Sequence, residues 1–428
     1  SHAAVIARGL GLPCVVGATD LIIDISKKTL VSNKGDLLFS GDLITIDGTQ
    51  GYIYRGQREM ILPKMSSSFN ALMHWSDLLR SLEVRANADT PQDAQLSRNF
   101  GADGIGLCRT EHMFLDEKRI FLMRQMILAE KIFKRKQFLD ELLPLLEQDF
   151  VELFKIMKDL PVCIRLLDTP LNDFLPNTDI DKTLLADSLG ISISEVVKKC
   201  SDLNEVNPML GKRGVRLGIM INEIYEMQVE AIFEAALHVN KSARHSILPE
   251  IMIPLVSTKK EVEFISQRIA QICQNLEKKI AGRINYKLGV VLETPRAALK
   301  ANEFSDFCNF LSFGTNDLTQ MTYGLSRDDA GRFMRDYLEK EVFSSDPFHT
   351  LDLEGVGELI LIAAERARQS DNFIELGLCG EHGGDPSSIT FCLEAKFDYV
   401  SCSPFRIPIA RLAAAQASIL QKRKICSD

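Results

Sequence analysis

The sequence lacks the features that mark several specialised classes of protein. No apolar run approaches the roughly 18 residues of a membrane-spanning helix. Its ten cysteines stand singly and form no Cys-x-x-Cys pair, which argues against a zinc site and against a disulfide framework. Positive charge is in deficit, because 50 Lys and Arg residues face 58 Asp and Glu residues, and a net charge of −8 disfavours nucleic acid as the main partner.

The chain also opens without a methionine or a targeting segment, since Ser1-His2 stands directly ahead of a run of small residues. We therefore expect that the chain was cut or that it begins inside a domain. The remaining composition is that of a globular protein, with 428 residues, 46% of them hydrophobic and 25% charged. These values predict a soluble cytoplasmic protein that has neither a membrane nor a nucleic acid as its partner.

The first 56 residues are predicted to form a short helix followed by strands. Apolar or alternating runs occur at 14–18, 21–26, 42–48 and 51–56, and Gly, Asp and Asn separate them. A segment of fewer than about 60 residues buries little core by itself. Residues 1–56 are therefore interpreted as the C-terminal part of a larger domain, and residues 57–80 as a linker that leads into a helix.

Residues 81–428 alternate between apolar strand-like runs and segments of helical length. Most runs are apolar throughout, as parallel strands covered on both faces are. The short glycine-flanked run at 214–218 is the one that we expect to be a loop. The other β–α units predict an α/β fold, a (β/α)8 TIM barrel, with a doubly wound open sheet as the structural alternative. The runs are EVRAN (83–87), GIGLCRTE (104–111), VCIRLLD (162–168), GVRLG (214–218), EIMIPLV (250–256), LGVVLET (288–294), FLSFGTND (310–317), ELGLCGE (375–381) and YVSCSPF (399–405).

Polar and ionisable residues collect at one end of these runs. In a TIM barrel the carboxyl ends of the strands surround the active site. Taken singly, each such residue is better explained as a solvent-facing strand end or as part of an Arg–Asp pair that braces the barrel. Taken together, the residues favour a functional site. They are Asn87, Asp89, Arg109, Glu111, Arg165, Asp168, Arg216, Glu293, Asn316, Asp317, Cys379 and Glu381.

Three kinds of side chain in this set predict a site for an enolate. Glu293 and Asp317 come from adjacent predicted strands and suit Mg²⁺, which binds one or two carboxylates and leaves positions for substrate oxygens. Arg109 and Arg165 carry planar, permanent charges that suit a phosphoryl group. Cys379 lies in the glycine-rich GLCGEHGG, where its thiol can deliver a proton to carbon. Pyruvate and phosphoenolpyruvate (PEP) are the smallest pair of compounds that uses all three functions.

Seven stretches of the sequence resemble the C-terminal barrel of the pyruvate, phosphate dikinase family of PEP-utilising enzymes. The resemblance covers essentially the whole chain. It implies a part in the conversion of ATP, phosphate and pyruvate to AMP, diphosphate and PEP, in which a nucleotide-binding domain phosphorylates a histidine and a swivelling domain carries it to the barrel. The stretches are GADGIGLCRTEHMF, IRLLDTPLNDFLP, NPMLGKRGVRLG, LETPRAAL, SFGTNDLTQMTYGLSRDDAGRF, GLCGEHGGDPSS and DYVSCSPFRIPIARLAAAQA.

The resemblance also implies roles for single residues. The opening SHAAVIARGLG resembles the end of the family's phosphohistidine motif, so residues 1–56 would belong to the truncated swivelling domain and His2 would be the phosphorylated histidine. In this chain His2 is expected to be stranded, because it neighbours a free α-amino group and lacks the strands that would position it. The barrel roles would be phosphoryl binding for Arg109 and Arg165, Mg²⁺ ligation for Glu293 and Asp317, substrate contact for Gly314, Thr315 and Asn316, and protonation of the enolate for Cys379. The family often has a histidine or an aromatic residue in place of Lys212, from which we expect tuning only, because Arg213 and Arg216 remain.

Several alternatives stay open at this point. The barrel could be that of a PEP synthase or of the PEP-protein phosphotransferase of sugar uptake. It could also be a module that senses PEP without turning it over, in which case it would have no use for the Cys379 thiol. A homodimer formed through the barrel is expected from the resemblance and from apolar helices such as residues 409–420.

Overall fold

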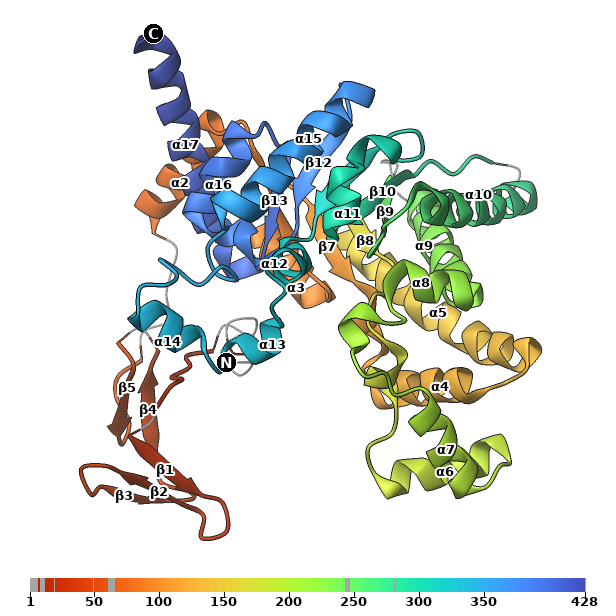
Figure 1. Cartoon of the computed structure of the whole chain (residues 1–428), viewed down its shortest axis with the longest axis horizontal. Coiled ribbons are helices and arrows are strands. Elements are labelled where there is room, and N and C mark those ends of the chain that lie inside the picture. Colours follow the sequence, from red (N-terminus) through yellow and green to blue (C-terminus); the bar gives the residue numbers. More distant parts are fainter. Residues whose placement is uncertain are drawn as a thin grey trace. The chain divides into compact units, whose positions relative to one another are not determined.

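The computed structural model describes residues 7, 12–18, 20–48, 50–60, 66–242, 247–280 and 282–427. The chain divides into two compact units, Ser1–His74 and Trp75–Asp428. The first unit holds two small antiparallel sheets, and the second holds a closed parallel barrel (Figure 1).

The first unit confirms three of the four predicted strands. β1 (Leu21–Asp24), β4 (Ile44–Asp47) and β5 (Tyr52–Arg55) fall within the expected runs. The prediction of a strand at 14–18 is wrong, because an apolar run becomes a strand only where a neighbour pairs with its backbone, and β1 pairs with β2 instead. The sequence reading missed two short strands, β2 (Thr29–Ser32) and β3 (Leu37–Phe39). The expected helix at the start of the chain falls almost entirely outside the described residues.

Helix α2 (Ser67–Leu79) begins inside the segment that was predicted to be a linker leading into a helix. The division between the two units falls within this helix, between His74 and Trp75. The domain boundaries expected from the sequence, after residues 56 and 80, stay a prediction.

The second unit confirms the (β/α)8 barrel and excludes the doubly wound open sheet. Its eight strands are all parallel, and β10 pairs with both β11 and β9, which closes the sheet on itself. The order around the barrel follows the order in the chain, as expected for successive right-handed β–α units. The strands are β6 (Glu83–Asn87), β7 (Ile105–Arg109), β8 (Val162–Arg165), β9 (Pro249–Ile253), β10 (Lys287–Leu292), β11 (Phe310–Phe313), β12 (Glu375–Leu378) and β13 (Tyr399–Cys402).

The run at 214–218 is a helix, not the loop that we expected. It forms most of α8 (Gly214–Met220). It has no place in the sheet, because β8 pairs directly with β9 from Val162↔Pro249 to Arg165↔Met252. Helical geometry instead buries Val215 and Leu217 and satisfies the backbone within the segment.

Helices surround the barrel, and the longest connections follow β8 and β11 (Figure 1). Local signals in the sequence start several of them. Thr90 caps α3 by accepting a hydrogen bond from the Asp93 amide, and Asp385 caps α16 in the same way through Ser388. The remaining helices are α3 (Pro91–Asn99), α4 (Glu117–Leu128), α5 (Ile132–Met157), α6 (Asp179–Leu189), α7 (Ile193–Asp202), α9 (Asn222–Ser242), α10 (Lys259–Ile280), α11 (Pro295–Leu299), α12 (Thr315–Tyr323), α13 (Arg327–Ala330), α14 (Met334–Glu339), α15 (Glu358–Ser370), α16 (Pro386–Glu394) and α17 (Ile407–Ser427).

The inside of the barrel is a packed core rather than a channel. Its buried cluster consists of Leu107, Cys163, Met252, Val291, Phe310 and Cys379. At the amino ends of the strands, the buried Arg85 lies 3.0 Å from Glu250 and 2.5 Å from Glu375, and its guanidinium stacks 3.9 Å from the centroid of the Tyr399 ring. This charged network closes the amino end of the barrel, where residues serve stability rather than catalysis.

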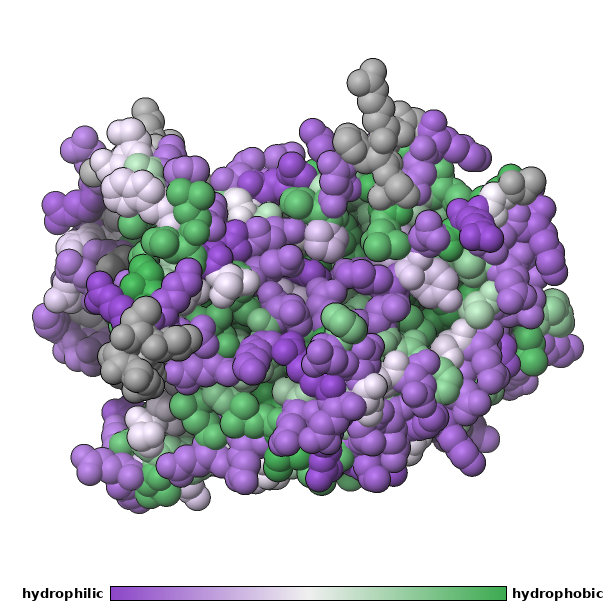
Figure 2. Space-filling view, turned by 90° about the horizontal axis from the view of Figure 1, so that it is seen from above, coloured by the Kyte–Doolittle hydropathy of each residue, from purple (hydrophilic) through white to green (hydrophobic). Residues whose placement is uncertain are grey.

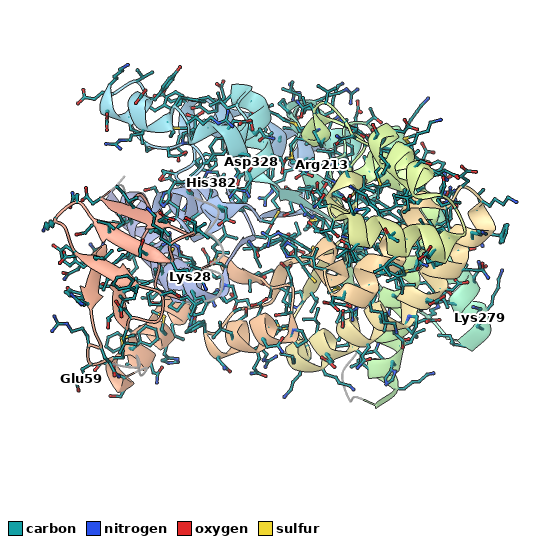
Figure 3. The ribbon with its side chains drawn as sticks, turned by 90° about the horizontal axis from the view of Figure 1, so that it is seen from below. Lys28, Glu59, Arg213, Lys279, Asp328 and His382 are labelled. Atoms are coloured by element: carbon teal, nitrogen blue, oxygen red, sulfur yellow. The ribbon has the colours of Figure 1, made fainter. Side chains whose placement is uncertain are left out.

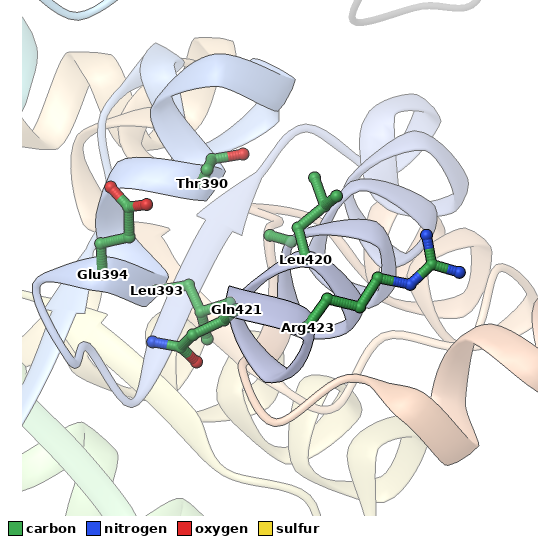
Figure 4. Close-up of a pocket in the computed structure, with 7 residues that line it drawn as sticks. Thr390, Leu393, Glu394, Leu420, Gln421 and Arg423 are labelled. Atoms are coloured by element: carbon green, nitrogen blue, oxygen red, sulfur yellow. The ribbon is translucent and has the colours of Figure 1, made fainter. Parts of the chain in front are cut away.

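A shallow, mostly apolar groove of about 410 Å³ lies between α16 and α17, and its lining includes Thr390, Leu393, Glu394, Leu420, Gln421 and Arg423 (Figure 4). It lies at the C-terminal ends of these helices, which is the amino end of the strands that they follow. Polar and charged residues cover most of the face seen in Figure 2, with apolar groups between them. Within the described ranges, no helix has the length and apolar content to cross a lipid bilayer.

Candidate active site

Except for Arg216, the predicted barrel residues lie at or just beyond the carboxyl ends of the strands. Arg109 and Arg165 are the last residues of β7 and β8. Glu293 directly follows β10, and Cys379 directly follows β12. Residues 314–317 follow β11 and open α12. Since the carboxyl ends of parallel strands meet at one edge of the barrel, these side chains surround a common mouth.

Arg109 is held in place by Asp89, which follows β6. The Arg109 amide donates to Oδ1 of Asp89 at 2.6 Å, and its guanidinium lies 3.2 Å from Oδ2. The Nδ1 atom of His112 lies 2.7 Å from the same Oδ2. Burial opposes the charge on Asp89, but Arg109 and His112 outweigh it and lower the pKa of Asp89. The hydrogen bond to Asp89 is also the main reason why the pKa of His112 is raised.

Arg165 is held by two carboxylates from neighbouring segments. Its guanidinium pairs with Glu111, and it lies 2.9 Å from Oδ2 of Asp168. The backbone of the segment is also fixed, because the Thr110 hydroxyl donates to the Arg165 carbonyl at 3.0 Å. Asp89 and other carboxylates raise the pKa of Arg109, while the charge of the nearby Arg165 acts in the opposite direction, so an anion at the mouth would be drawn to both arginines.

Arg213 joins the two sides of this site, and the sequence reading assigned it no role of its own. The guanidinium of Arg213, labelled in Figure 3, donates to Oδ2 of Asp168 at 3.0 Å and to Oδ1 of Asp317 at 3.1 Å. Burial opposes its charge, but Asp168, Asp317 and Glu293 together raise the pKa of Arg213. The residue lies in a connection ahead of α8 rather than at a strand end, so a search of strand ends could not find it.

Glu293 is buried in a carboxylate-rich corner. Its Oε1 accepts a hydrogen bond from the Leu255 amide at 2.6 Å. A Cβ atom at Gly314 would lie 2.7 Å from Oε2 of Glu293, so the β11 loop can approach this carboxylate only with glycine at that position. Burial and the charges of Asp168 and Asp317 raise the pKa of Glu293 well above its ordinary value.

The residues of this corner fit a divalent cation. The ionised form of Glu293 is opposed by the nearby Asp317, and Arg165 and Arg213 only partly balance this repulsion. A cation would relieve this repulsion, and Mg²⁺ binds through one or two carboxylates together with substrate oxygens. Among the residues that the structure describes, no three His, Cys, Asp or Glu side chains form a metal-binding group, so substrate oxygens would have to supply the remaining ligands.

Cys379 lies at the top of the buried barrel cluster, directly beneath the mouth. Its Sγ lies 3.6 Å from the Phe313 carbonyl oxygen, which can accept the thiol proton. Burial raises the pKa of Cys379 to about 11, while the Ser312 hydroxyl acts in the opposite direction. The group is therefore a thiol and a proton donor at neutral pH. Its carbonyl accepts a hydrogen bond of 3.4 Å from Asn87, whose own amide oxygen accepts from Ser401 at 2.6 Å.

The loops that follow β11 and β12 are tied to each other. The Glu381 amide donates to Oδ1 of Asn316 at 3.1 Å. Oγ1 of Thr315 lies 2.7 Å from Nδ1 of His382, a buried residue that the sequence reading did not single out. The glycine-rich stretch GEHGG is the signal in the sequence that could have pointed to His382 as well as to Cys379.

Two further expectations need comment. Arg216, which was counted among the strand ends, lies in α8 and donates to the carbonyls of Leu210 and Gly211 at 2.6 and 3.0 Å, so it braces the preceding turn. This placement corrects its inclusion in the strand-end set. His2, the expected phosphorylated residue, lies outside the described residues.

Two family models match the chain. Residues 64–419 match the model described as PEP-utilising enzyme, PEP-binding domain. Residues 1–51 match the model described as PEP-utilising enzyme, mobile domain.

Curated relatives named pyruvate, phosphate dikinase are similar over nearly the whole chain. The protein from Rhizobium meliloti (strain 1021) is 52% identical over 98% of this chain and 46% of its own length. The protein from Rickettsia prowazekii (strain Madrid E) is 50% identical over 98% of this chain and 48% of its own. The protein from Clostridium symbiosum is 46% identical over 99% and 48%. The chain thus spans about half the length of the curated relatives it matches. The resemblance read from the motifs is confirmed, and the chain belongs to the PEP-utilising enzyme family.

Proposed function

We propose that this chain carries the PEP–pyruvate half of the pyruvate, phosphate dikinase reaction. A phosphoryl group would pass between a phosphohistidine and the enolate oxygen of pyruvate at the barrel mouth. The observation that carries the proposal is the meeting of two arginines, two carboxylates and a buried thiol at one barrel edge. The names of the relatives support the same reaction.

In this proposal, each residue has a separate task. Arg109 and Arg165 bind the phosphoryl oxygens, and their ion pairs with Asp89 and Glu111 hold the guanidinium planes in position. Glu293 and Asp317 would hold Mg²⁺, which when bound supplies positive charge for the enolate oxygen. Gly314, Thr315 and Asn316, which follow β11, would contact the substrate from the same loop.

Cys379 would move the proton on carbon. When PEP gives up its phosphoryl group to the histidine, the enolate C3 takes a proton from the Cys379 thiol, and pyruvate forms. In the direction of PEP synthesis, the Cys379 thiolate takes a proton from the pyruvate methyl group, and the enolate oxygen then attacks the phosphohistidine phosphorus. The raised pKa supports the thiol as the resting form. A module that only senses PEP would not need this group.

Three further parts of the proposal concern the whole protein. His2 would be the residue that is phosphorylated, the family's nucleotide-binding domain would be the partner that phosphorylates it, and two chains would pair through their barrels. The match of residues 1–51 to a mobile domain supports the first of these. The whole reaction would therefore need more than this chain.

Calorimetric titration with oxalate, a planar dianion that resembles the pyruvate enolate, tests the proposal. We expect binding only in the presence of Mg²⁺, and we expect Asp317→Ala and Glu293→Gln to abolish it. Asp306→Asn is the matched control, because Asp306 is an exposed carboxylate that lies 2.6 Å from Lys259. Absence of binding to the unaltered chain with Mg²⁺, or undiminished binding to Asp317→Ala, would contradict the proposal.

A further inference from the structure

We propose that His382 is a positioning residue of the enolate site. It directs the Thr315 hydroxyl, and it keeps the segment after β12, here called the Cys379 loop, in register with the segment after β11, here called the Asp317 loop. The inference rests on the proposed function for its catalytic consequence. The geometry of His382 itself does not depend on that function.

The hydrogen bonds of His382 determine its tautomer. Its Nε2 lies 2.9 Å from the carbonyl oxygen of Pro347, and a carbonyl can only accept. Nε2 therefore carries the hydrogen. In the neutral ring Nδ1 is then an acceptor, and its partner at 2.7 Å is the Thr315 hydroxyl, which must donate.

The surroundings keep the ring neutral. His382 is fully buried, and burial lowers its pKa, although the Pro347 carbonyl acts in the other direction. A neutral ring with a fixed tautomer can accept the hydrogen bond from the Thr315 hydroxyl throughout the neutral pH range. The hydroxyl hydrogen of Thr315 is thus directed to His382, and the hydroxyl can offer other partners only its lone pairs.

The Thr315 hydroxyl is enclosed on a second side. A Cβ atom at Gly380 would lie only 2.0 Å from Oγ1 of Thr315, so the backbone of the Cys379 loop packs directly against this hydroxyl. Backbone amides also hold the two loops in register on both sides of this contact. The Cys379 amide donates to the Phe313 carbonyl at 3.1 Å, and the Glu381 amide donates to Oδ1 of Asn316. The hydrogen bond between the His382 and Thr315 side chains adds to these contacts and fixes the position of one loop relative to the other.

The Pro347 contact brings in a third segment, the connection from α14 to α15. That connection is also held by the Ser388 hydroxyl, which accepts from the Leu351 amide at 3.2 Å. His382 thus joins three loops of the mouth. A displacement of about 1 Å between a thiol and a reacting carbon can cost on the order of a hundredfold in rate, so a joint of this kind is expected to affect proton transfer.

Two substitutions separate the two bonds of the ring. The shorter side chain of His382→Asn places an amide near the Nδ1 position, where it can pair with Thr315, but it does not reach Pro347. The longer side chain of His382→Gln reaches the Nε2 position and can donate to Pro347, but it leaves Thr315 without its partner. His349→Gln is the matched control, because His349 is exposed and its Nδ1 lies 3.4 Å from the hydroxyl of its neighbour Thr350.

The rate of exchange of pyruvate methyl protons for deuterium, followed by proton NMR with Mg²⁺, is the catalytic readout. We expect His382→Gln to exchange about tenfold or more slowly, and His382→Asn to stay within about threefold of the unaltered chain. The exchange rate of Thr315→Val should fall as far as that of His382→Gln. The exchange rate of the double variant Thr315→Val/His382→Gln should fall no further than that of Thr315→Val alone. Equal losses in the Asn and Gln variants, or additive losses in the double variant, would overturn the proposal.

A second readout needs neither ligand nor turnover. ¹⁵N NMR of histidine-labelled chain should show His382 as the neutral Nε2–H tautomer, and a resonance of the Nδ1–H tautomer or of a cation would overturn the assignment. Failure of the unaltered chain to bind oxalate would count against the proposed function and leave this tautomer measurement intact. The two proposals can therefore fail separately.

Discussion

Arg213 and Asp317 form an ion pair of 3.1 Å across the mouth of the barrel, and the same guanidinium lies 3.0 Å from Asp168. Asp317 is the carboxylate that would also hold the cation. Arg213 therefore supplies a positive charge to a corner that contains more carboxylates than it can balance, and a metal ion would share this task.

Replacement of Arg213 tests this relationship. Arg213→Met takes one of two arginine partners from the buried Asp168, which keeps Arg165, and removes the ion pair of Asp317, so we expect a loss of about 3 kcal/mol in the free energy of unfolding. Mg²⁺ should raise the melting temperature more in this variant than in the unaltered chain, because the cation then meets less competing positive charge. Calorimetry with and without Mg²⁺ measures both effects. Arg216→Met is the control, and its two bonds to backbone carbonyls predict a loss of only about 1–2 kcal/mol. Equal losses in the two variants would contradict the role given to Arg213.

Cys379→Ser should separate binding from proton transfer. The hydroxyl is of similar size, so we expect the oxalate affinity to stay within about threefold, while exchange of pyruvate methyl protons falls by about a hundredfold or more. Because the pKa of Cys379 is about 11, the thiolate that removes a proton from pyruvate becomes more abundant as pH rises. The exchange rate of the unaltered chain should therefore rise with pH across the neutral range. Parallel loss of affinity and exchange would argue that Cys379 only shapes the site.

The His112–Asp89 pair should stabilise the protein in a defined pH window. The folded pKa of His112 is raised from 6.5, chiefly by its bond to Asp89. The stabilisation is therefore fully present below pH 6.5 and is lost as pH rises through the raised pKa. The melting temperature of His112→Gln should fall furthest below that of the unaltered chain at acidic pH, and the gap should narrow at alkaline pH. His238→Gln is the comparison, because His238 lies 3.7 Å from Glu147 and is largely exposed. A gap that widens with pH would contradict the assignment.

Arg85 at the opposite end of the barrel should matter for stability and not for ligand binding. Arg85→Met leaves Glu250 and Glu375 with Lys287 as their remaining common partner, and we expect the loss of the buried guanidinium to cost about 3 kcal/mol in the free energy of unfolding. Oxalate affinity should not change in the fraction that stays folded. Denaturant unfolding and calorimetry give the two quantities. The double variant Arg85→Met/Glu250→Gln should recover part of the loss, and failure to recover any would mean that packing on Tyr399 is the larger contribution.

The strand ends show which site residues local sequence patterns can predict. Arg109, Arg165, Glu293 and Cys379 could be found from the sequence because each follows an apolar run, and a closed parallel barrel brings every such position to one edge. The segment at 214–218 shows the limit of the same reasoning. Its composition suits several conformations, and only the direct pairing of β8 with β9 decides that it is a helix.

The amino-acid sequence by itself determined the barrel and the residues that stand at the strand ends, because periodicity and chain order express them locally, and the resemblance of its motifs indicated the family. The tertiary structure alone decided which charges meet. Arg213 contacts an aspartate 45 residues before it and another 104 residues after it, and His382 contacts Thr315 from 67 residues away. Such contacts depend on the distances that closure of the barrel creates between loops, and no spacing along the chain records those distances.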